Sequence, residues 1–122
     1  MKRIIHVDNS VFFRKQVRLF LEAAGFAVEG FGSAQEARMA INGGLADMII
    51  MGLAFSDSEG EEFLARTVES FAGPIIVVSS SIDARKAGKL ISLGARATIN
   101  KSASWKSDLE PYLYALKLKL GR

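Results

Sequence analysis

The chain has 122 residues, 49% hydrophobic and 24% charged, which is typical of one folded domain, and we expect that domain to span residues 1–122. The net charge of +3 is mild. The sequence has no basic stripe interleaved with aromatic residues, so we do not expect nucleic-acid binding. The absence of cysteine excludes disulfides, thiolate chemistry and cysteine-ligated zinc. No apolar run approaches the roughly 20 residues that cross a bilayer, and no signal-peptide core follows the start, so we expect a cytoplasmic protein without membrane contact.

The first part of the chain alternates between strand and helix signals. Residues 3–7 predict a strand, which the helix-capping triplet Asp8-Asn9-Ser10 ends. Residues 26–31 predict a second strand, and a capping box from Ser33 to Glu36 opens a second helix that ends at residues 42–44. Between the two strands lies an amphipathic helix that ends before Gly25, with a predicted buried face of Phe13, Val17, Phe20, Leu21 and Ala24.

The central strand signal spans residues 47–53, where four consecutive apolar residues stand between Asp47 and Gly52. A continuous apolar run this short is typical of a parallel strand that is covered on both faces. Residues 75–78 predict another buried strand of the same kind. Between them, a polar loop over residues 56–60 leads to a third helix with the predicted buried residues Phe63, Leu64, Val68 and Phe71.

The last part of the chain repeats the alternation and adds a terminal helix. Residues 97–100 predict a fifth strand that ends at Lys101. A fourth helix before it is indicated by Ala87, Leu90, Ile91 and Gly94, and the last helix by Leu109, Leu113, Leu116 and Leu120. Because proline has no N–H, we expect the last helix to begin near Asp108, with Pro111 in its first turn; the alternative is a start near Ser104 and a bend.

Five strand signals that alternate with five helix signals predict a parallel sheet with helices on both faces, because each parallel crossover contains a helix. We predict an α/β fold, with a doubly wound five-stranded sheet in the flavodoxin-like order 2-1-3-4-5. The strand order then reverses between the first and third strands, which is where such sheets bind ligands. The strand ends near this point carry Asp8, Asn9, Gly52, Ser79 and Lys101.

Several short stretches, taken in their order and spacing, resemble the receiver domains of two-component response regulators of the chemotaxis-regulator kind. These stretches are residues 6–10, 47–52, 59–60, 74–80, 93–95 and 100–101. The resemblance covers nearly the whole chain, and it implies the (βα)5 receiver fold and a role in bacterial phosphorelay signalling. Members of this family take a phosphoryl group from a histidine kinase onto an aspartate at the end of the third strand, with a Mg²⁺ ion that neutralises charge.

The resemblance assigns a role to three residues that match the family's pattern. Asp8 stands at the first acidic position of the metal site. Ser79 supplies the hydroxyl group, and Lys101 the ammonium group, that would contact the phosphoryl oxygens.

Four other positions depart from the pattern. Asn9 stands at the second acidic position, Gly52 at the phosphoacceptor position and Thr98 at the position of the switch aromatic, and Ser102 replaces a proline. Acyl-phosphate formation needs a carboxylate nucleophile, which glycine lacks. Mg²⁺ usually binds one or two carboxylates, so Asp8 alone would be a weak ligand set. We therefore expect a remnant pocket with no catalytic residue, no enzyme activity and no cofactor, in which Mg²⁺ binding is weak or absent.

The same residues have simpler structural interpretations. Asp8 and Lys101 are expected to form an ion pair that joins two strand ends, and Ser79 to be a hydrogen-bonded loop residue. Asp57, five residues after the vacant acceptor position, is a substitute acceptor only if its loop folds back over the pocket, and a solvated turn residue is the simpler expectation. His6 lies inside the first strand and is expected to be a satisfied core histidine.

Aromatic and basic residues near the C-terminus leave two interpretations open. Trp105, Tyr112 and Tyr114 either form a docking face or cover the core beside the last helix. The basic residues within positions 117–122 suit a helix C-terminus, where positive charge interacts favourably with the helix dipole.

We predict a degenerate receiver domain that acts by phosphorylation-independent protein–protein interaction. The family commonly uses the fourth helix, fifth strand and fifth helix as its partner surface, here residues 82–120, for another protein or a second copy. The alternatives are a small-ligand or nucleotide-binding flavodoxin-like module, and a receiver phosphorylated at a non-standard acidic residue. No glycine-rich phosphate loop follows the first strand, which argues against a nucleotide or flavin site.

Overall fold

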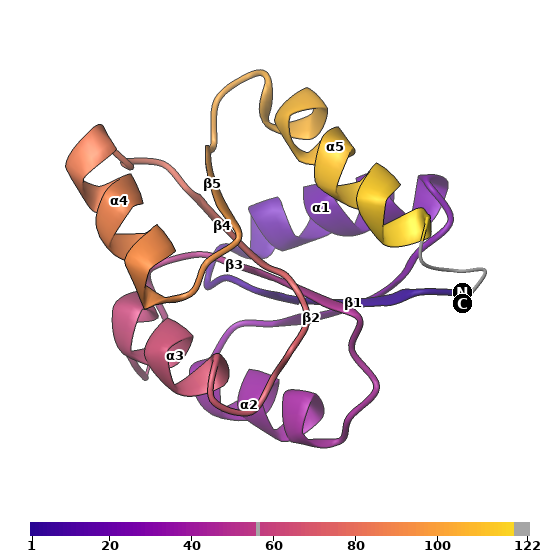
Figure 1. Cartoon of the computed structure of the whole chain (residues 1–122). Helices are drawn as coiled ribbons and strands as arrows, with labels where there is room; N and C mark the ends of the chain where they lie inside the picture. The colour runs from indigo at the N-terminus through magenta and orange to yellow at the C-terminus, as the bar shows by residue number, and fades with distance from the viewer. Residues whose placement is uncertain (56, 119–122) are drawn as a thin grey trace.

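The computed structural model describes residues 1–55 and 57–118, and it contains one parallel sheet between two layers of helices (Figure 1). The elements in chain order are β1 (Arg3–Val7), α1 (Val11–Ala23), β2 (Ala27–Phe31), α2 (Ala34–Asn42), β3 (Met48–Met51), α3 (Gly60–Thr67), β4 (Ile75–Ser79), α4 (Ala84–Leu93), β5 (Ala97–Asn100) and α5 (Trp105–Lys117). The strand order is β2-β1-β3-β4-β5 and every pairing is parallel, which confirms the predicted doubly wound fold. No helix in the described part of the chain is long and apolar enough to cross a membrane.

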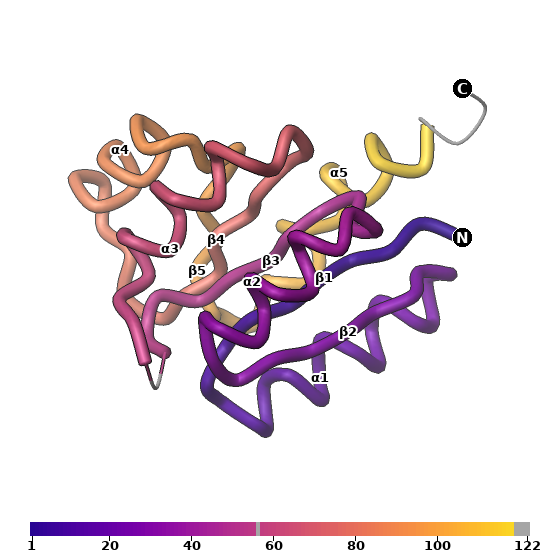
Figure 2. The backbone as a smooth tube through the Cα atoms, turned by 90° about the horizontal axis from the view of Figure 1, so that it is seen from below, coloured from indigo at the N-terminus to yellow at the C-terminus, as the bar shows by residue number. Residues whose placement is uncertain are grey.

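The sheet divides the hydrophobic core into two layers. The helices α1 and α5 cover one face, and α2, α3 and α4 cover the other (Figure 1). Neighbouring strand residues alternate between the layers, so that Ile4 packs in the first core and Ile5 in the second. All four residues of β3 are buried, as the continuous apolar run predicted. Figure 2 shows α3 and α4 gathered at one end of the molecule, away from the start of β1.

Side chains cap the first two helices as their sequences predicted. The Ser10 hydroxyl oxygen accepts a hydrogen bond from the Phe13 N–H at 3.1 Å. The Ser33 hydroxyl oxygen accepts from the Glu36 N–H at 3.3 Å, and the same hydroxyl donates to the Glu36 carboxylate at 3.2 Å. Gly25 follows α1 with a φ of +97°, which is the left-handed conformation that glycine adopts without strain.

α3 is shorter than its apolar spacing predicted. It ends at Thr67, so Val68 and Phe71 pack against the core from the following turn instead of from the helix. Hydrogen bonds of the 3₁₀ type tighten this turn: the Glu69 and Ser70 N–H groups each donate to the carbonyl three residues earlier. The spacing of apolar residues therefore continued past the end of the helix.

α5 begins at Trp105, after Ser104, so the expected start near Asp108 was wrong and the alternative start is correct. The Trp105 side chain is only 8% exposed, and its burial against α1 holds the first helical turn in place. Pro111 consequently lies inside the helix, where it cannot donate the usual backbone hydrogen bond. Leu120, the last residue of the predicted apolar face, lies outside the described residues.

Candidate functional site

Three strand ends bring Asp8, Gly52 and Lys101 together at one edge of the sheet. Asp8 directly follows β1, and Gly52 directly follows its neighbour β3. The Gly52 N–H donates to the Val7 carbonyl at 2.8 Å, which continues the strand pairing and holds Gly52 beside Asp8. Lys101 follows β5, and its N–H donates to the Ser79 carbonyl at 2.9 Å. Parallel pairing alone therefore sets the positions of these residues.

The expected ion pair between Asp8 and Lys101 is present. The Lys101 Nζ lies 2.9 Å from Oδ2 of Asp8, and the Asp8 side chain is 4% exposed. The attraction at Oδ2 is Coulombic, because this atom has no hydrogen bond of favourable geometry. The other oxygen, Oδ1, accepts from the Ser10 N–H at 2.9 Å. Both carboxylate oxygens are thus engaged by groups of the chain itself.

The Asp8 carboxylate occupies the space that a side chain at position 52 would need. A Cβ added to Gly52 would lie 2.7 Å from Oδ2 and 3.1 Å from Cγ of Asp8. Carbon atoms do not approach a carboxylate this closely without displacing it. The φ angle of Gly52 is not positive, so the position requires glycine for space and not for backbone conformation.

The other residues of the predicted site stand around the ion pair without joining it. Asn9 is exposed, and Thr98 lies half-buried within β5. Ser79 is the last residue of β4 and not a loop residue as expected. Its backbone carbonyl accepts the hydrogen bond from the Lys101 N–H. Ser102 is exposed, with its hydroxyl 3.0 Å from that of Ser104.

The donor set at the strand ends does not fit Mg²⁺. This ion requires octahedral oxygen coordination at short distances, usually with one or two carboxylates. Asp8 has both oxygens engaged, Asn9 offers only a neutral amide, and Gly52 offers no side chain. Within residues 1–55 and 57–118, no three His, Asp or Glu side chains gather closely enough to hold a metal ion.

His6 is buried as expected, but its ring is not satisfied by hydrogen bonds. It is 1% exposed, and neither ring nitrogen has a hydrogen-bond partner. The ring instead packs edge-on against Phe13, with the centroids 5.7 Å apart. Burial lowers the pKa of His6 from 6.5 to about 4; Asp8 opposes the shift, and the cations of Lys101 and Arg14 add to it. His6 is therefore neutral at pH 7.

Asp57 does not fold back over the pocket, and it is not a merely solvated turn residue. Its two carboxylate oxygens accept hydrogen bonds from the first N–H groups of α2, at 2.8 Å from Ala34 and 3.1 Å from Gln35. These bonds, with that from Ala34 the strongest, hold the pKa of Asp57 below its ordinary value. Asp57 thus caps a helix that is distant in sequence.

Asn100, which the sequence reasoning did not single out, fixes the loop between β4 and α4. Its side-chain oxygen accepts from the Ile82 N–H at 3.0 Å, and its side-chain nitrogen donates to the Ile82 carbonyl at 3.3 Å. The only sequence signal was an amide residue at the end of a strand, next to a lysine that the family pattern identified.

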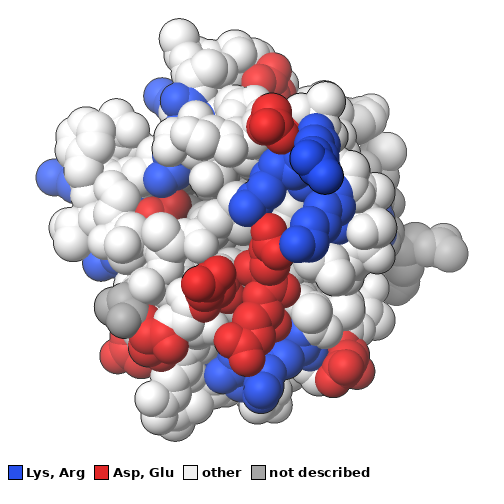
Figure 3. Space-filling view, turned by 90° about the vertical axis from the view of Figure 1, so that its left-hand side faces the viewer, with Lys and Arg blue, Asp and Glu red and all other residues white. Residues whose placement is uncertain are grey.

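A charged contact between α3 and α4 holds α4 against the domain. Glu61 forms ion pairs with Lys86 at 2.9 Å and with Lys89 at 3.0 Å. The hydrogen bond from Lys86 is the largest cause that lowers the pKa of Glu61. Figure 3 shows basic side chains next to acidic ones on this face. Leu90 is the one buried residue of α4, and Ile91, expected to mark the helix, is 46% exposed. α4 therefore depends on polar contacts more than the other helices do.

A chain of aromatic contacts leads from the ion pair into the core beside α1 and α5. The Lys101 Nζ lies 4.3 Å from the centroid of the Phe13 ring. Phe13 packs edge-to-face against Trp105, with the centroids 5.2 Å apart, and Trp105 packs in the same way against Phe20 at 5.4 Å. The single tryptophan of the chain is thus one side chain away from the ion pair.

Of the two interpretations left open for the C-terminal aromatic residues, covering the core holds for two of the three, and a docking role stays a prediction. The tryptophan and Tyr112 pack against the core, whereas Tyr114 is 66% exposed. Lys117 lies in the last turn of α5, as the dipole argument expected, with its Nζ 5.3 Å from the Phe26 ring centroid. Residues 119–122 lie outside the described residues.

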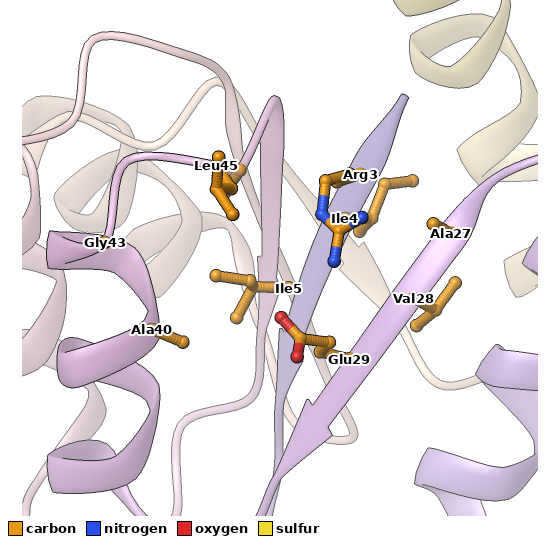
Figure 4. A pocket seen from close by; sticks show the side chains of 10 residues that line it. Arg3, Ile4, Ile5, Ala27, Val28, Glu29, Ala40, Gly43 and Leu45 are labelled. Carbon is orange, nitrogen blue, oxygen red and sulfur yellow. The ribbon is translucent and has the colours of Figure 1, made fainter. Parts of the chain in front are cut away.

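A hollow of about 280 Å³ opens at the opposite ends of β1 and β2, beside α2 (Figure 4). Arg3 and Glu29 lie at its rim, and small or aliphatic residues such as Ala40 line the rest. None of the residues of the candidate site borders this hollow. It is distinct from the strand ends where polar groups converge.

Comparisons with known proteins agree with this geometry. A family model described as the response regulator receiver domain matches residues 4–110. No curated protein sequence matches the chain. A CheY-like receiver domain protein from Methanospirillum hungatei JF-1 is similar, with 24% identity and a TM-score of 0.86 over 96% of this chain and 94% of that one. A two-component response regulator from Clostridium difficile has 16% identity and a TM-score of 0.90 over the whole of both chains. Chemotaxis protein CheY4 of Vibrio cholerae has 23% identity and a TM-score of 0.83 over 95% of this chain and 98% of that one.

Proposed function

We propose that this chain, which belongs to the response regulator receiver domain family, is a pseudo-receiver that signals in the bacterial cytoplasm without being phosphorylated. Receiver domains interact with other proteins, and we assign to this one the interaction without the phosphotransfer. The observation that carries the proposal is at the end of β3, where Gly52 provides no carboxylate and the Asp8 carboxylate fills the space instead. No other group at the strand ends combines a nucleophile with an orienting base, so we propose no catalytic activity.

The proposal includes weak or absent Mg²⁺ binding. To bind the ion through one oxygen, Asp8 would have to give up or weaken its contact with Lys101 or with the Ser10 N–H. Separating a buried charge from its partner is strongly unfavourable. Magnesium would therefore have to compensate for a lost or weakened contact while gaining a single carboxylate.

We further propose that the partner surface is formed by α4, β5 and α5, in one fixed arrangement. Two contacts support a fixed arrangement: the paired hydrogen bonds from Asn100 to Ile82, and the ion pairs of Glu61 with α4. A ligand shifts a conformational equilibrium only through unequal affinity for the two states. Without a phosphoryl group to provide that difference, this surface is constitutively available to a protein partner or to a second copy.

A phosphorylation assay tests the proposal. The native chain is incubated with acetyl phosphate and Mg²⁺, and its intact mass and Trp105 fluorescence are followed. The matched control is the double variant Asn9→Asp, Gly52→Asp, which supplies the two missing carboxylates. We expect no gain of a phosphoryl mass and no fluorescence change in the native chain, and a gain in the control. A phosphoryl mass in the native chain that peptide mapping assigns to an acidic residue would favour the alternative receiver with a non-standard acceptor.

A further inference from the structure

The hollow at the starts of β1 and β2, on the α2 side of the sheet, exists because small residues line much of it (Figure 4). Its volume is about 280 Å³. The lining includes Ala27, Ala40, Gly43 and Ala46, none of which has a side chain long enough to fill the space between the strands and the helix. We call it the β1/β2 hollow. No described residue of α4, β5 or α5 borders it, so it is separate from the proposed partner surface.

The floor of the β1/β2 hollow is apolar, and two opposite charges stand above it. In the register of β1 and β2, Arg3 lies beside Ala27 and Ile5 beside Glu29. Because residues two apart on a strand share a face, these four side chains project from the same side of the sheet. Ile5 is only 3% exposed and belongs to the core layer on this side, whereas Arg3 and Glu29 are exposed. The hollow therefore reaches down to the core beside one cation and one anion.

The two charges at the rim are not paired. Figure 4 shows the Arg3 guanidinium and the Glu29 carboxylate turned toward one another above the strands. Neither group forms an ion pair, with the other or with any residue in the described ranges. Both groups are therefore available to a ligand, and a ligand that lies between them contacts both.

We propose that the β1/β2 hollow binds a small aliphatic α-amino acid, such as free leucine. The carboxylate of the ligand accepts hydrogen bonds from the Arg3 guanidinium, whose planar fork of donors matches a carboxylate. The ammonium of the ligand contacts the Glu29 carboxylate, and its aliphatic side chain lies on the floor against Ile5 and Ala40. An α-amino acid carries both charges on one carbon atom, next to its apolar body, which is the combination that this rim and floor present in complementary form.

The charges and the volume select a small zwitterion over other small molecules. An aliphatic carboxylate would bring a like charge next to Glu29, and an aliphatic amine would bring one next to Arg3, and both arrangements are unfavourable. The volume of about 280 Å³ lies below the range of about 300–1,000 Å³ that is typical of pockets for drug-sized ligands. A nucleotide or a flavin is therefore too large for the hollow.

The depth of the floor argues against a protein surface as the occupant. Arg3, Glu29 and Leu45 stand at the rim, and Leu45 is 67% exposed. The floor residues Ile5 and Val28 are only 3% and 8% exposed. A second copy of the chain would meet the charged rim before its side chains reached the floor, whereas a small free molecule contacts both.

The ligand test follows the amide NMR resonances of the isotope-labelled full chain during a titration with free leucine. We expect saturable shifts in residues 3–5, 27–29 and 40–46, with a dissociation constant on the order of a millimolar, because the ligand is small. Three analogues each remove one feature of the ligand: isocaproate lacks the ammonium, isoamylamine lacks the carboxylate, and free glycine lacks the aliphatic body. Each analogue should bind about fivefold more weakly than leucine.

Variants assign the two charged contacts. Glu29→Gln should bind leucine about fivefold more weakly and should abolish the difference between leucine and isocaproate, which a merely structural change would leave in place. Arg3→Gln should do the same for leucine and isoamylamine. Ala27→Val fills the hollow from a strand position that favours valine, and should bind no leucine. The matched control, Arg85→Gln with Glu110→Gln, removes one cation and one anion from exposed positions outside the hollow and should bind leucine like the native chain.

Any of three results would overturn the proposal. The first is the absence of saturable shifts in the lining residues, as expected if Arg3 and Glu29 pair with each other in solution. The second is binding of isocaproate or isoamylamine as tight as that of leucine. The third is self-association in sedimentation experiments that Glu29→Gln weakens, which would identify a second copy as the occupant. Acetyl phosphate is absent from all of these measurements, so their outcome is independent of the phosphorylation assay.

Discussion

At the scale of single residues, Asp8 determines how the pocket is held together. A buried carboxylate is stable only with a cation or with hydrogen-bond donors, and Lys101 and the Ser10 N–H provide both. The carboxylate reaches its place between the strand ends because Gly52 leaves that place open. Both oxygens of the Asp8 carboxylate therefore have a partner within the chain itself.

The glycine requirement at position 52 can be measured. We expect Gly52→Ala to lower the free energy of unfolding by about 1–3 kcal/mol, because the new methyl group displaces Asp8 from Lys101. Gly88→Ala, within α4, is the matched control, since an added Cβ there meets no atom within 4 Å. This control should raise the free energy of unfolding by about 0.5–1 kcal/mol, as alanine is the better helix former. Urea denaturation measures both, and a Gly52→Ala variant as stable as the native chain contradicts the steric argument.

His6 should make the folded state sensitive to acid. Its pKa is about 4 in the folded chain and near 6.5 when unfolded, so below pH 6.5 the unfolded state binds the proton first. The stability contribution of neutral His6 is complete above pH 6.5 and is lost as the pH falls toward 4, by about 3 kcal/mol in all. The His6→Leu variant lacks this loss. As the pH falls from 7 to 4, the difference in free energy of unfolding between the two chains should therefore shift by about 3 kcal/mol in favour of the variant, and a difference that stays constant would contradict the assignment.

The residues of the site differ in how far the sequence predicted them. The family pattern and strand pairing placed Asp8, Gly52 and Lys101 together, because parallel strand ends meet at one edge. The unpaired ring of His6 and the cap that Asp57 forms on α2 could not be predicted in this way. Both depend on side-chain directions between segments distant in sequence, about which periodicity carries no information.

At the scale of elements, α4 is the helix most dependent on polar contacts. The side chain of Asn100 connects β5 to the loop before α4, and Glu61 connects α3 to the helix itself. The exposed ion pairs contribute little individually. The paired hydrogen bonds of Asn100 are the more directional of the two connections, since they engage both the backbone N–H and the backbone carbonyl of Ile82.

Removing the Asn100 side chain should loosen this region. We expect Asn100→Ala to increase amide hydrogen exchange in residues 80–93 and to leave exchange in α1 unchanged, because the Ile82 N–H and carbonyl lose their partners. Asn100→Asp is the comparison variant, since it keeps an acceptor for the Ile82 N–H but replaces the donor with a charged oxygen, so the Ile82 N–H itself should exchange more slowly in it than in the alanine variant. Unchanged exchange in residues 80–93 of the alanine variant would refute a role for Asn100 in fixing the loop.

The errors of element prediction have a common physical origin. Apolar residues at helical spacing predicted α3 to continue through Phe71, although the helix ends at Thr67 and the chain turns while still packing against the core. Pro111 predicted a later start for α5, but the burial of Trp105 outweighs one lost hydrogen bond. In both helices tertiary packing decided where the regular hydrogen bonding begins or ends.

At the scale of the whole molecule, the alternation of strands and helices predicted a parallel sheet, and the number of strands favoured the flavodoxin-like one of the two common strand orders, which is the order observed. Given that order, the reversal between β1 and β3 determines the position of the site. The docking surfaces do not follow from it. The pocket of about 340 Å³ between α1 and α5, for example, depends on how Phe20 and Phe26 meet α5, which the spacing of either segment alone does not reveal.

Our central claim is that the ion pair of Asp8 and Lys101 takes the place of a phosphoryl group and its metal ion. The most direct measurement is a titration of the native chain with beryllofluoride and Mg²⁺, followed by fluorine NMR. We predict only free beryllofluoride resonances, with the Trp105 fluorescence unchanged. A resonance of protein-bound beryllofluoride that depends on Mg²⁺ and disappears in the Asp8→Ala variant would contradict the claim.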